Sequence, residues 1–522
     1  MRAEVLLQAR ALRSPEKVAV ISGAERTSFA GLAASVARVA AGLAQLGVGP
    51  GDRIVLYLPN GTAFVELAFA AFSLGAIAVP VTTRLTGHEL AYICEDCEPR
   101  VVAFHASQAA LVEGIAGAPG PAKRVVVGGT AADALPLAAL REAPAAPLPE
   151  VPVEAEDAVI MYTSGTTGRP KGAIITHANL VIQHYMLNAL DWGLSAEDRF
   201  LVTTPLAHRT GFARMANALM LGATLVAMPK FEAEAAAETI ARHGITVAGM
   251  VPTVCRMLLP AIAADASRFA SLRRMVVTGE AFPVDLKRRL IELLPQVRLA
   301  SFAMTEVGSV TGLDHAEQFT HPASVGRPSP GVETRLVDER GAPVAPGEVG
   351  ELLVRSGPPG QGTTMRGYFR RDAETARAIR NGWLHTGDMA RQDAEGYLYI
   401  VDRKKDMVLS GGFNIYTKEV EQALIACPEV LDAAVVGVPD PIYGEAVVAF
   451  VEAAPGSGLT AQAVTDHCRT LIAGYKKPRH VLVVDALPRN SLGKVLKTDL
   501  RQCAQAALTA ASENGTHPPG SV

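Results

Sequence analysis

The sequence predicts an α/β fold in which helices cover both faces of mostly parallel sheets. Short apolar runs alternate with helical patterns and glycine-rich turns, as residues 52–60, 62–75 and 76–82 illustrate with a strand, a helix and a strand. Such alternation is typical of parallel sheets that are buried on both sides. Because 522 residues are too many for one hydrophobic core, we expect two or more domains.

The same alternation continues through the first half of the chain. Strand-like and helix-like segments recur at residues 198–206, 210–222, 223–231, 246–254 and 272–283. Near residues 347–356 and 396–403 the spacing of the apolar runs shortens, which indicates antiparallel strands.

Beyond residue 403, a helical pattern followed by two apolar strand patterns predicts a small separate α/β unit. We therefore place an N-terminal domain at residues 1–402, a C-terminal domain at residues 403–510 and a disordered tail at residues 511–522. The alanine- and proline-rich segment 118–156 is expected to be a loose surface insertion.

Composition narrows the classes of function. A formal net charge of −3 without any basic block argues against a nucleic acid partner. The most membrane-like run, residues 63–81, is interrupted by Glu66, Gly75 and Pro80, so we expect a buried helix and strand rather than membrane insertion. Six cysteines without a recognisable signal peptide indicate a reducing compartment, and a cytoplasmic location is expected.

Residues 162–172, YTSGTTGRPKG, have the composition of an anion-binding loop that follows a strand. Glycines let backbone N–H groups approach a ligand, hydroxyl groups add donors, and a lysine supplies positive charge. The spacing differs from that of the common P-loop. A flexible surface turn rich in serine, threonine and glycine is the alternative.

Six further clusters of glycine and polar residues fall at expected loop positions, where parallel sheets bind ligands. Each cluster alone could be an ordinary turn. They are TGE (278–280), FAMTE (302–306), GWLHTGD (382–388), DRKKD (402–406), SGGFNIY (410–416) and PRNSLGK (488–494).

Taken in this order, the loop and the six clusters resemble the adenylate-forming superfamily, which includes acyl-CoA synthetases, peptide-synthetase adenylation domains and luciferases. The resemblance covers nearly the whole chain, from about Ser14 to Asp499. The segments PLAHRTGF, AMPKFE, SVGRPSPG, GYFRR and GWLHTGD are most similar to acyl- and aryl-CoA ligases such as 4-coumarate-CoA ligase.

The resemblance implies an ATP-dependent acid–thiol ligase. A carboxylate would attack the α-phosphate of ATP, pyrophosphate would leave, and CoA would then capture the acyl group from acyl-AMP. The implied fold has a large N-terminal domain of stacked mixed sheets with flanking helices and a β-structured subdomain, followed by a small mobile α/β C-terminal domain. The implied ligands are a carboxylic acid, ATP, Mg²⁺ and CoA.

The resemblance also assigns a nucleotide site. Thr166 and Glu306 would hold Mg²⁺, a hard cation that prefers oxygen ligands. Asp388 would accept hydrogen bonds from both ribose hydroxyls, and Arg403 would contact the nucleotide. The remaining implied residues are Thr163, Ser164, Gly165, Thr167, Gly168 and Lys171 at the phosphates, Gly279, Glu280, Ala281 and Phe302 beside adenine, and Ala303, Met304 and Thr305 next to them.

Catalytic, hinge and pocket residues are implied in the same way. Lys494 would bridge the acyl carboxylate and the α-phosphate, with Glu306 and His208 as the other catalytic residues. Lys405 would be the hinge about which the C-terminal domain swings. A purely structural role is the alternative for His208. Gly411 and Gly412 would lie against the pantetheine arm of CoA, and His208, Phe212 and Ala303 would line the acyl pocket.

Three positions depart from the family pattern, since Phe302 replaces Tyr, Ala303 replaces Gly and Thr417 replaces Pro. We expect Ala303 to narrow the acyl pocket and Thr417 to have no consequence for the chemistry. Arg209 has no assigned role and would face either solvent or a polar group on the acid.

The leading hypothesis from sequence is a CoA ligase for a monocarboxylic acid with an apolar or aromatic body. Two alternatives stay open: an acyl-AMP ligase that loads a carrier-protein phosphopantetheine, and a catalytically silent nucleotide-binding protein on the same fold. The sequence also leaves a homodimer open.

Overall fold

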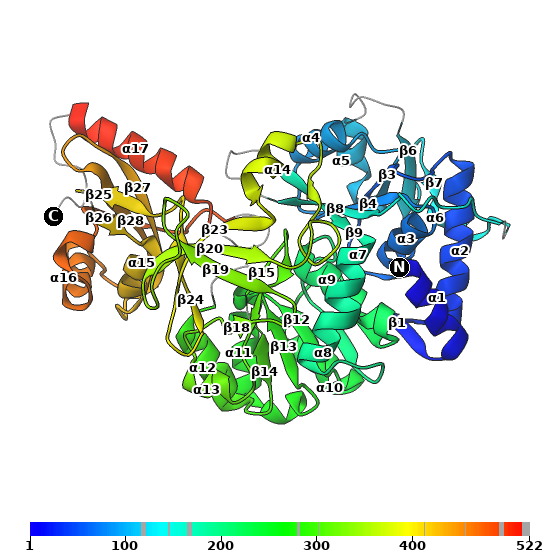
Figure 1. Cartoon of the computed structure of the whole chain (residues 1–522), viewed down its shortest axis with the longest axis horizontal. Helices are drawn as coiled ribbons and strands as arrows, with labels where there is room; N and C mark the ends of the chain where they lie inside the picture. Colours follow the sequence, from blue (N-terminus) through cyan, green and yellow to red (C-terminus); the bar gives the residue numbers. More distant parts are fainter. Residues whose placement is uncertain are drawn as a thin grey trace. The chain divides into compact units, whose positions relative to one another are not determined.

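The computed structural model describes most of the chain as two compact units (Figure 1). The first unit comprises Met1–Thr334 and Leu353–His385, and the second comprises Arg335–Leu352 and Thr386–Val522. The described residues are 1–115, 122–144, 147–163, 170–278, 282–300, 302–411, 413–454, 456–489 and 495–513.

The first unit contains an eight-stranded sheet whose central strands are parallel. Its strands β3 (Arg53–Tyr57), β4 (Ile77–Val81) and β5 (Val101–His105) are apolar apart from Arg53 and His105 at their ends, which explains their burial on both sides. An antiparallel hairpin, β8–β9, extends the sheet on one side. The strands in sheet order are β21 (Gly367–Tyr368), β9 (Lys171–Thr176), β8 (Asp157–Thr163), β4 (Ile77–Val81), β3 (Arg53–Tyr57), β5 (Val101–His105), β6 (Lys123–Val127) and β7 (Leu135–Pro136).

A second sheet of the same unit has seven strands, all paired in parallel except β1 and β2. The strands in sheet order are β14 (Arg298–Ala300), β13 (Arg274–Val277), β12 (Val247–Met250), β10 (Arg199–Val202), β11 (Thr224–Ala227), β1 (Val18–Ser22) and β2 (Glu25–Ser28). This stacked, mixed α/β arrangement confirms the predicted fold class.

Helices cover both sheets. α3 (Thr62–Ser73) contacts β1, β3 and β4, and α9 (Arg209–Leu221) contacts β10, β11 and β12, so both helices lie in the layer between the sheets. α1 (Ala3–Arg13) and α2 (Phe29–Gln45) pack against α3. The outer helices are α4 (Gly87–Cys97) and α5 (Ala109–Gly114) on the eight-stranded sheet, and α10 (Ala233–His243), α11 (Pro252–Ala264) and α12 (Val284–Leu293) on the seven-stranded sheet.

The membrane-like run 63–81 forms α3 and β4, as predicted. Glu66 is buried within α3, where its carboxylate accepts from the Ser35 hydroxyl at 2.5 Å and pairs with Arg141 at 2.5 Å. These partners explain how α3 carries a charge inside the protein. In the described part of the chain, no helix is long and apolar enough to cross a membrane.

The segment 118–156 is not the loose insertion that its composition suggests. Its residues Lys123–Val127 form β6, which pairs in parallel with β5, and Leu137–Arg141 form the helix α6. The side chains of Val125, Val126 and Leu140 are buried. A run of β-branched residues next to a free sheet edge is therefore enough to add a strand, despite the flanking alanines and prolines.

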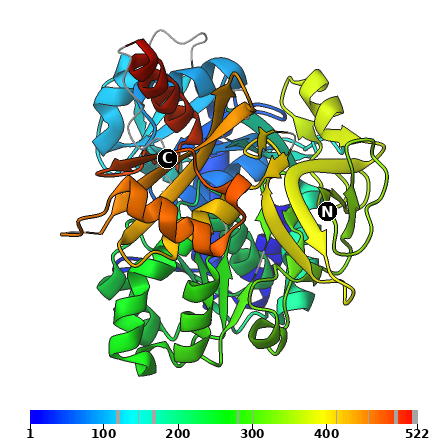
Figure 2. The same cartoon turned by 90° about the vertical axis from the view of Figure 1, so that its left-hand side faces the viewer.

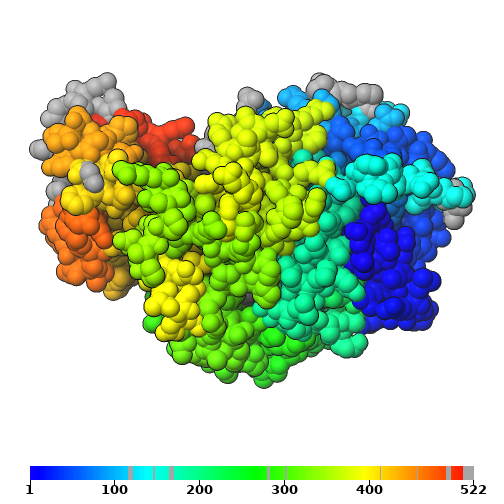
Figure 3. All heavy atoms as spheres, viewed as in Figure 1, coloured from blue at the N-terminus to red at the C-terminus, as the bar shows by residue number. Residues whose placement is uncertain are grey.

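The residues at the start of the chain contact the end of this segment. Arg2 donates to the carbonyl oxygen of Ala155 at 2.5 Å, and Figure 3 shows the dark blue N-terminal surface beside the cyan segment near residue 150. The first residues of the chain thus take part in the packing of this unit.

An antiparallel sheet follows, as the shortened spacing predicts. It contains β19 (Glu333–Val337), β20 (Val349–Arg355), β23 (Trp383–Gln392) and β22 (Ile379–Arg380), and β24 (Leu398–Arg403) pairs with β23. Residues 388–392 pair with 398–403, and by their packing both segments belong to the second unit together with residues 335–352. A boundary for independent domain movement at 402/403 stays a prediction.

The second unit ends in a small α/β sandwich. Its sheet contains β26 (Phe413–Ile415), β25 (Val408–Ser410), β28 (Gly444–Ala453), β27 (Val430–Asp440) and β29 (His480–Val484). α15 (Thr417–Ile425) and α16 (Ala461–Leu471) cover one face, and α17 (Lys497–Glu513) covers the other (Figures 1 and 2). α17 ends at Glu513, and residues 514–522 lie outside the described residues, so the tail at 511–522 stays a prediction.

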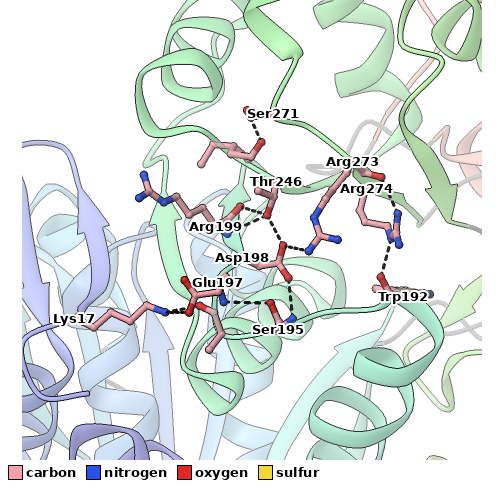
Figure 4. Close-up of polar contacts among 12 residues, drawn as sticks. Lys17, Trp192, Ser195, Glu197, Asp198, Arg199, Thr246, Ser271, Arg273 and Arg274 are labelled. Carbon is pink, nitrogen blue, oxygen red and sulfur yellow. Dashed lines mark hydrogen bonds and ion pairs between the residues drawn. The ribbon is translucent and has the colours of Figure 1, made fainter. Parts of the chain in front are cut away.

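At the amino ends of the seven-stranded sheet, a buried carboxylate holds several loops together (Figure 4). Asp198 accepts from the Ser195 N–H at 2.8 Å, from the Thr246 hydroxyl at 2.5 Å and from the Arg273 guanidinium at 2.6 Å. These partners precede or connect β10, β12 and β13. The network thus fixes the strand ends opposite to the edge where their carboxyl ends meet.

We predict that Asp198→Ala lowers the free energy of unfolding of the first unit by about 3 kcal/mol, since it leaves a guanidinium, a hydroxyl and an N–H without their shared acceptor. Both tryptophans of the chain, Trp192 and Trp383, lie in this unit, so their fluorescence during urea unfolding reports on it. The control is Glu197→Ala, because Glu197 is 90% exposed and pairs with Lys17 at 3.6 Å. Equal losses in both variants would contradict the prediction.

Candidate active site

The candidate site of the first unit lies where parallel strands of the seven-stranded sheet end at their carboxyl edge. After β10 the chain runs through residues 203–208 into α9. Asn60, from the loop after β3, fixes this connection by accepting from the Leu206 N–H at 2.6 Å and donating to the Thr204 carbonyl at 3.0 Å. Ligands of α/β proteins bind at this edge.

His208 is the N-cap residue of α9, and its Nδ1 accepts from the Thr210 N–H at 3.4 Å. The Thr210 hydroxyl meets the hydroxyl of Thr278, which follows β13, at 2.7 Å. The helix start is held very close to the preceding loop, because a Cβ on Gly211 would lie 2.3 Å from the Pro205 carbonyl oxygen. The structure therefore places His208 at the carboxyl edge of the sheet, and its role in the acyl pocket stays a prediction.

Phe212, also predicted for the acyl pocket, is fully buried. Its ring packs edge-on against Phe64 of α3, with 6.5 Å between the ring centroids. The Phe212 ring thus packs between α9 and α3.

The segment FAMTE forms one side of a short hairpin. β15 (Ala303–Met304) pairs with β16 (Gly308–Ser309), and Phe302 accepts from the Val310 N–H at 2.9 Å. Glu306 lies in the turn between the two strands. Gly308 has a positive φ of 74°, which glycine adopts without strain. It also lies close to the side chain of Gln183, which a Cβ on residue 308 would overlap.

Two predicted residues from distant segments meet through a tyrosine that sequence reasoning left without a role. The Tyr368 hydroxyl donates to Glu306 Oε1 at 3.1 Å. The Lys171 ammonium lies 5.4 Å from the centroid of the Tyr368 ring. Tyr368 is held beside β9 by pairing with Ala173. The signal for Tyr368 was the GYFRR segment, which carried the resemblance but no residue assignment.

The anion-binding loop joins β8 to β9, and Thr163 pairs with Lys171 at its base. The strand predicted before the loop is confirmed, and a second strand rather than a helix follows it.

Several predicted site residues fall outside the described part of the chain. They are Ser164, Gly165, Thr166, Thr167 and Gly168 in the loop, Gly279, Glu280 and Ala281 after β13, and Gly412 and Lys494 in the second unit.

In the second unit, Asp388 and Arg403 lie opposite each other on β23 and β24. The Arg403 Nε contacts Asp388 Oδ1 at 2.7 Å, and Asp388 is buried. A carboxylate and a guanidinium predicted to contact one nucleotide are thus neighbours. Gly411 has a φ of 58°, and its N–H donates to the Tyr443 carbonyl at 2.8 Å, which fits a tight turn.

Thr417, which stands where the family pattern has proline, has a structural role in the second unit. It is fully buried, and both its N–H and its hydroxyl donate to the buried carboxylate of Asp402, the hydroxyl at 2.9 Å. Lys497 of α17 contacts the same hydroxyl at 2.8 Å. Because proline has neither an N–H nor a hydroxyl, these contacts belong to the chain that carries threonine.

Lys405, the predicted hinge residue, lies in a turn directly after β24. The turn is closed by a hydrogen bond of 2.9 Å from the Asp406 N–H to the Arg403 carbonyl. Arg501 of α17 pairs with the Asp406 carboxylate at 2.7 Å.

Comparison with known proteins matches both parts of the chain. The AMP-binding enzyme family model matches residues 7–369, and the model of the AMP-binding enzyme C-terminal domain matches residues 419–494. The chain belongs to the AMP-binding enzyme family. This membership confirms the predicted adenylate-forming superfamily and the class of AMP-forming acid–thiol ligases.

Relatives of this AMP-binding enzyme span its full length. A feruloyl-CoA synthase from an Amycolatopsis species is 37% identical, with 94% of this chain and 97% of the relative covered. A long-chain-fatty-acid–CoA ligase from Mycobacterium tuberculosis is 34% identical, over 95% and 97% of the two chains. The structure of an anthranilate CoA ligase with anthranoyl-AMP has a TM-score of 0.87 at 29% identity, over 98% of each chain.

His208 and His184 are neutral near pH 7. Burial lowers the pKa of His208 to about 4. Burial, together with the charges of Arg209 and Arg214, holds the pKa of His184 well below its usual range. In the unfolded chain both imidazoles bind protons near pH 6.5, whereas the folded protein binds them only at lower pH.

We therefore predict that the free energy of unfolding of the first unit falls as the pH decreases from about 6.5 toward 4, by up to about 1.4 kcal/mol per pH unit for each histidine. His208→Asn keeps an N-cap oxygen and removes one titrating group, so the slope should flatten by about that amount. Urea unfolding followed by tryptophan fluorescence at several pH values measures the slope. An unchanged slope would show that His208 titrates normally in the folded protein.

Proposed function

We propose that this AMP-binding enzyme is an ATP-dependent acid–CoA ligase. A carboxylate oxygen of the acid attacks the α-phosphorus of ATP and pyrophosphate leaves; the CoA sulfur then attacks the acyl carbon and AMP leaves. The observation that carries the proposal is the meeting of Lys171 and Glu306 at Tyr368. A cation and a carboxylate held together at the base of a phosphate-type loop suit a nucleotide triphosphate.

Within the first unit, Lys171 and the loop from Thr163 onward bind the β- and γ-phosphates. Glu306 and Thr166 would hold Mg²⁺, and the Glu306 carboxylate fits this role because it is only partly buried and offers the oxygen ligands that this cation prefers. Bound Mg²⁺ offsets negative charge on the phosphates. Tyr368 orients the carboxylate through its hydroxyl.

The adenine and acyl groups use the neighbouring hairpin and helix start. Phe302 offers a ring to adenine opposite the segment 279–281, with Met304 and Thr305 beside it. Ala303 is only partly buried and narrows the acyl pocket by one methyl group compared with glycine. His208 gates this pocket as a neutral imidazole, and Phe212 is proposed as part of its wall.

In the second unit, Asp388 accepts from the ribose hydroxyls and Arg403 contacts the nucleotide while also pairing with Asp388. Lys494 is the cation that bridges the acyl carboxylate and the α-phosphate. Gly411 and Gly412 leave room for the pantetheine arm, since any Cβ would obstruct it.

Free CoA is the proposed acceptor. The relatives at 34–37% identity are named as CoA ligases or CoA synthases, which supports free CoA over a carrier-protein phosphopantetheine. The cytoplasmic location and a homodimer stay predictions from sequence.

Lys494 separates the two half-reactions. We predict that Lys494→Ala loses acid-dependent pyrophosphate exchange by several orders of magnitude, because a charge partner of the transition state is removed. Thioester formation from supplied acyl-AMP and CoA should survive. The measurement is both assays on both proteins over fatty, aryl and dicarboxylic acids. Equal loss in the two assays would contradict the role of Lys494, and a wild-type protein silent in both assays would contradict the proposed function.

The hinge at Lys405 should show the opposite pattern. Proline fixes φ near −65° and restricts the residue before it, so Lys405→Pro should keep pyrophosphate exchange and lose thioester formation. Lys405→Ala removes the side chain without restricting the backbone and should keep both activities. Normal thioester formation by Lys405→Pro would place the hinge elsewhere.

A further inference from the structure

Two buried arginines of α9 have guanidinium groups that the described residues leave unsatisfied. Arg209 is 6% exposed and Arg214 is 3% exposed. All three guanidinium nitrogens of Arg209, and Nε and Nη1 of Arg214, lack a hydrogen-bond partner within the described part of the chain. Buried charges of this kind are costly unless something pairs with them.

Buried arginines elsewhere in the same unit are satisfied. Arg298, 7% exposed, donates to the carbonyl oxygens of Leu313 and Asp191, each at 2.6 Å, and pairs with the Asp191 carboxylate at 3.2 Å. The Arg298 guanidinium therefore stabilises the fold, whereas the N–H donors of Arg209 and Arg214 are left for a ligand.

The residues around the two arginines are polar but neutral. The Gln183 amide donates to Asn188 Oδ1 at 2.9 Å, and the Asn188 amide meets His184 Nδ1 at 3.3 Å. With Nδ1 as acceptor, the proton of the neutral His184 ring lies on Nε2, which is also unpaired among the described residues. His184 thus adds another donor to those of the arginines.

Two amide oxygens, Gln183 Oε1 and Asn217 Oδ1, are unpaired in the same region of the described chain. They can accept hydrogen bonds, but neutral amides do not balance two positive charges. Burial lowers the pKa of Arg209 to about 10 and, with the charge of Arg209, that of Arg214 to about 9, so both remain charged at neutral pH.

The position of Arg214 is built into the fold. Its guanidinium lies 4.8 Å from the centroid of the buried Trp192 ring, at the end of α8 (Asn188–Trp192). Its stem runs along β12 at Gly249, where a Cβ would lie 2.6 Å from the Arg214 Cγ. Stacking on tryptophan and the missing side chain at Gly249 hold a charged group in place without neutralising it.

Arg209 and Arg214 lie at different distances from the phosphate end of the site. The Glu306 carboxylate acts electrostatically on Arg209, the first residue of α9. Arg214 lies five residues further along the helix, about 7.5 Å at a rise of 1.5 Å per residue. Arg209 thus lies at the helix start beside His208, and the Arg214 guanidinium lies against Trp192 at the end of α8.

We propose that Arg209 and Arg214 form a subsite for a second carboxylate, at the far end of the acid that the enzyme activates. The inference rests on the proposed function and gives its substrate a chemical class: dicarboxylic acids, in place of the monocarboxylic acid that the sequence favours. Guanidinium groups bind carboxylates in bidentate geometry, and an anionic ligand supplies the acceptors that the described residues lack.

A nucleotide phosphate is the other anion that these donors could meet. The position of Arg214 favours the acid, because Lys171 and Glu306 mark the phosphate end and Arg214 is displaced from it along α9. The two candidate anions predict different kinetic effects of removing an arginine. If the anion is the acid's second carboxylate, the preference between acids changes; if it is a nucleotide phosphate, the KM for ATP changes.

The experiment compares straight-chain monocarboxylic acids with dicarboxylic acids of the same length, by pyrophosphate exchange and by thioester formation with CoA. We expect kcat/KM to favour the dicarboxylic acid by about 100-fold or more, as for sites whose buried polar groups are left unpaired by the wrong substrate. Arg209→Met and Arg214→Met should each remove most of this preference and leave the KM for ATP near its original value.

Thermal unfolding provides a readout that does not depend on activity. Replacing an unpaired buried charge by methionine should leave the Tm of the free protein unchanged or raise it. The control Arg298→Met should lower the Tm, because it leaves Asp191 without its partner, and should not change the preference between the acids. The dicarboxylic acid alone should raise the Tm of the wild type and not that of Arg214→Met.

Three results would overturn the proposal. The first is a wild type that prefers monocarboxylic acids. The second is a rise in the KM for ATP of the arginine variants with an unchanged acid preference, which would assign the donors to the nucleotide. The third is a fall in Tm for the Arg209 and Arg214 variants as large as that of Arg298→Met, which would make both arginines structural. A wild type that activates no acid yet is stabilised by the dicarboxylic acid would contradict the proposed function and retain the subsite.

Discussion

The close approach of α9 to the end of β10 is the constraint on which the candidate site depends. Gly211 is the contact point, because a side chain there would overlap the carbonyl of Pro205. The preceding loop is fixed in turn by Asn60, whose amide bonds Thr204 and Leu206. This packing places the start of α9, with His208 and Arg209, at the carboxyl edge of the sheet, and the Glu306 carboxylate acts electrostatically on Arg209.

The first unit treats buried charge in two ways. Asp198 and Arg298 are surrounded by partners, and each ties together segments that are distant in the sequence. Arg209 and Arg214 are held in place by packing but not neutralised by the described residues. Charged groups that stabilise a fold are expected to have partners within the protein. Charged groups that bind a ligand are expected to lack such partners in the free protein, because function often lowers stability. The second unit follows the first pattern, because Asp402 is enclosed by the N–H and hydroxyl of Thr417 directly before the turn that contains Lys405.

The sequence by itself determined the fold class, the order of the main elements and the family. Short apolar runs, helical patterns and glycine-rich turns are local signals, so β3, α3, β10 and α9 could be predicted without their neighbours. The motif residues Lys171, Glu306 and Asp388 were also identifiable, because their spacing within short loops carries the resemblance. The β6 strand was missed, since its propensity was hidden by flanking alanines and prolines and only a free sheet edge made it a strand.

Only the tertiary structure decided which residues meet. Tyr368 joins Lys171 to Glu306 from a segment with no local sign of that role. The sequence assigned Thr417 no role in the chemistry, and only the structure shows that its hydroxyl donates to the Asp402 carboxylate. The charges of Arg209 and Arg214 were visible in the sequence, but their lack of partners was not. Burial and hydrogen bonding depend on segments hundreds of residues apart, which no local pattern records, and it is this missing neutralisation that points to the chemistry of the acid.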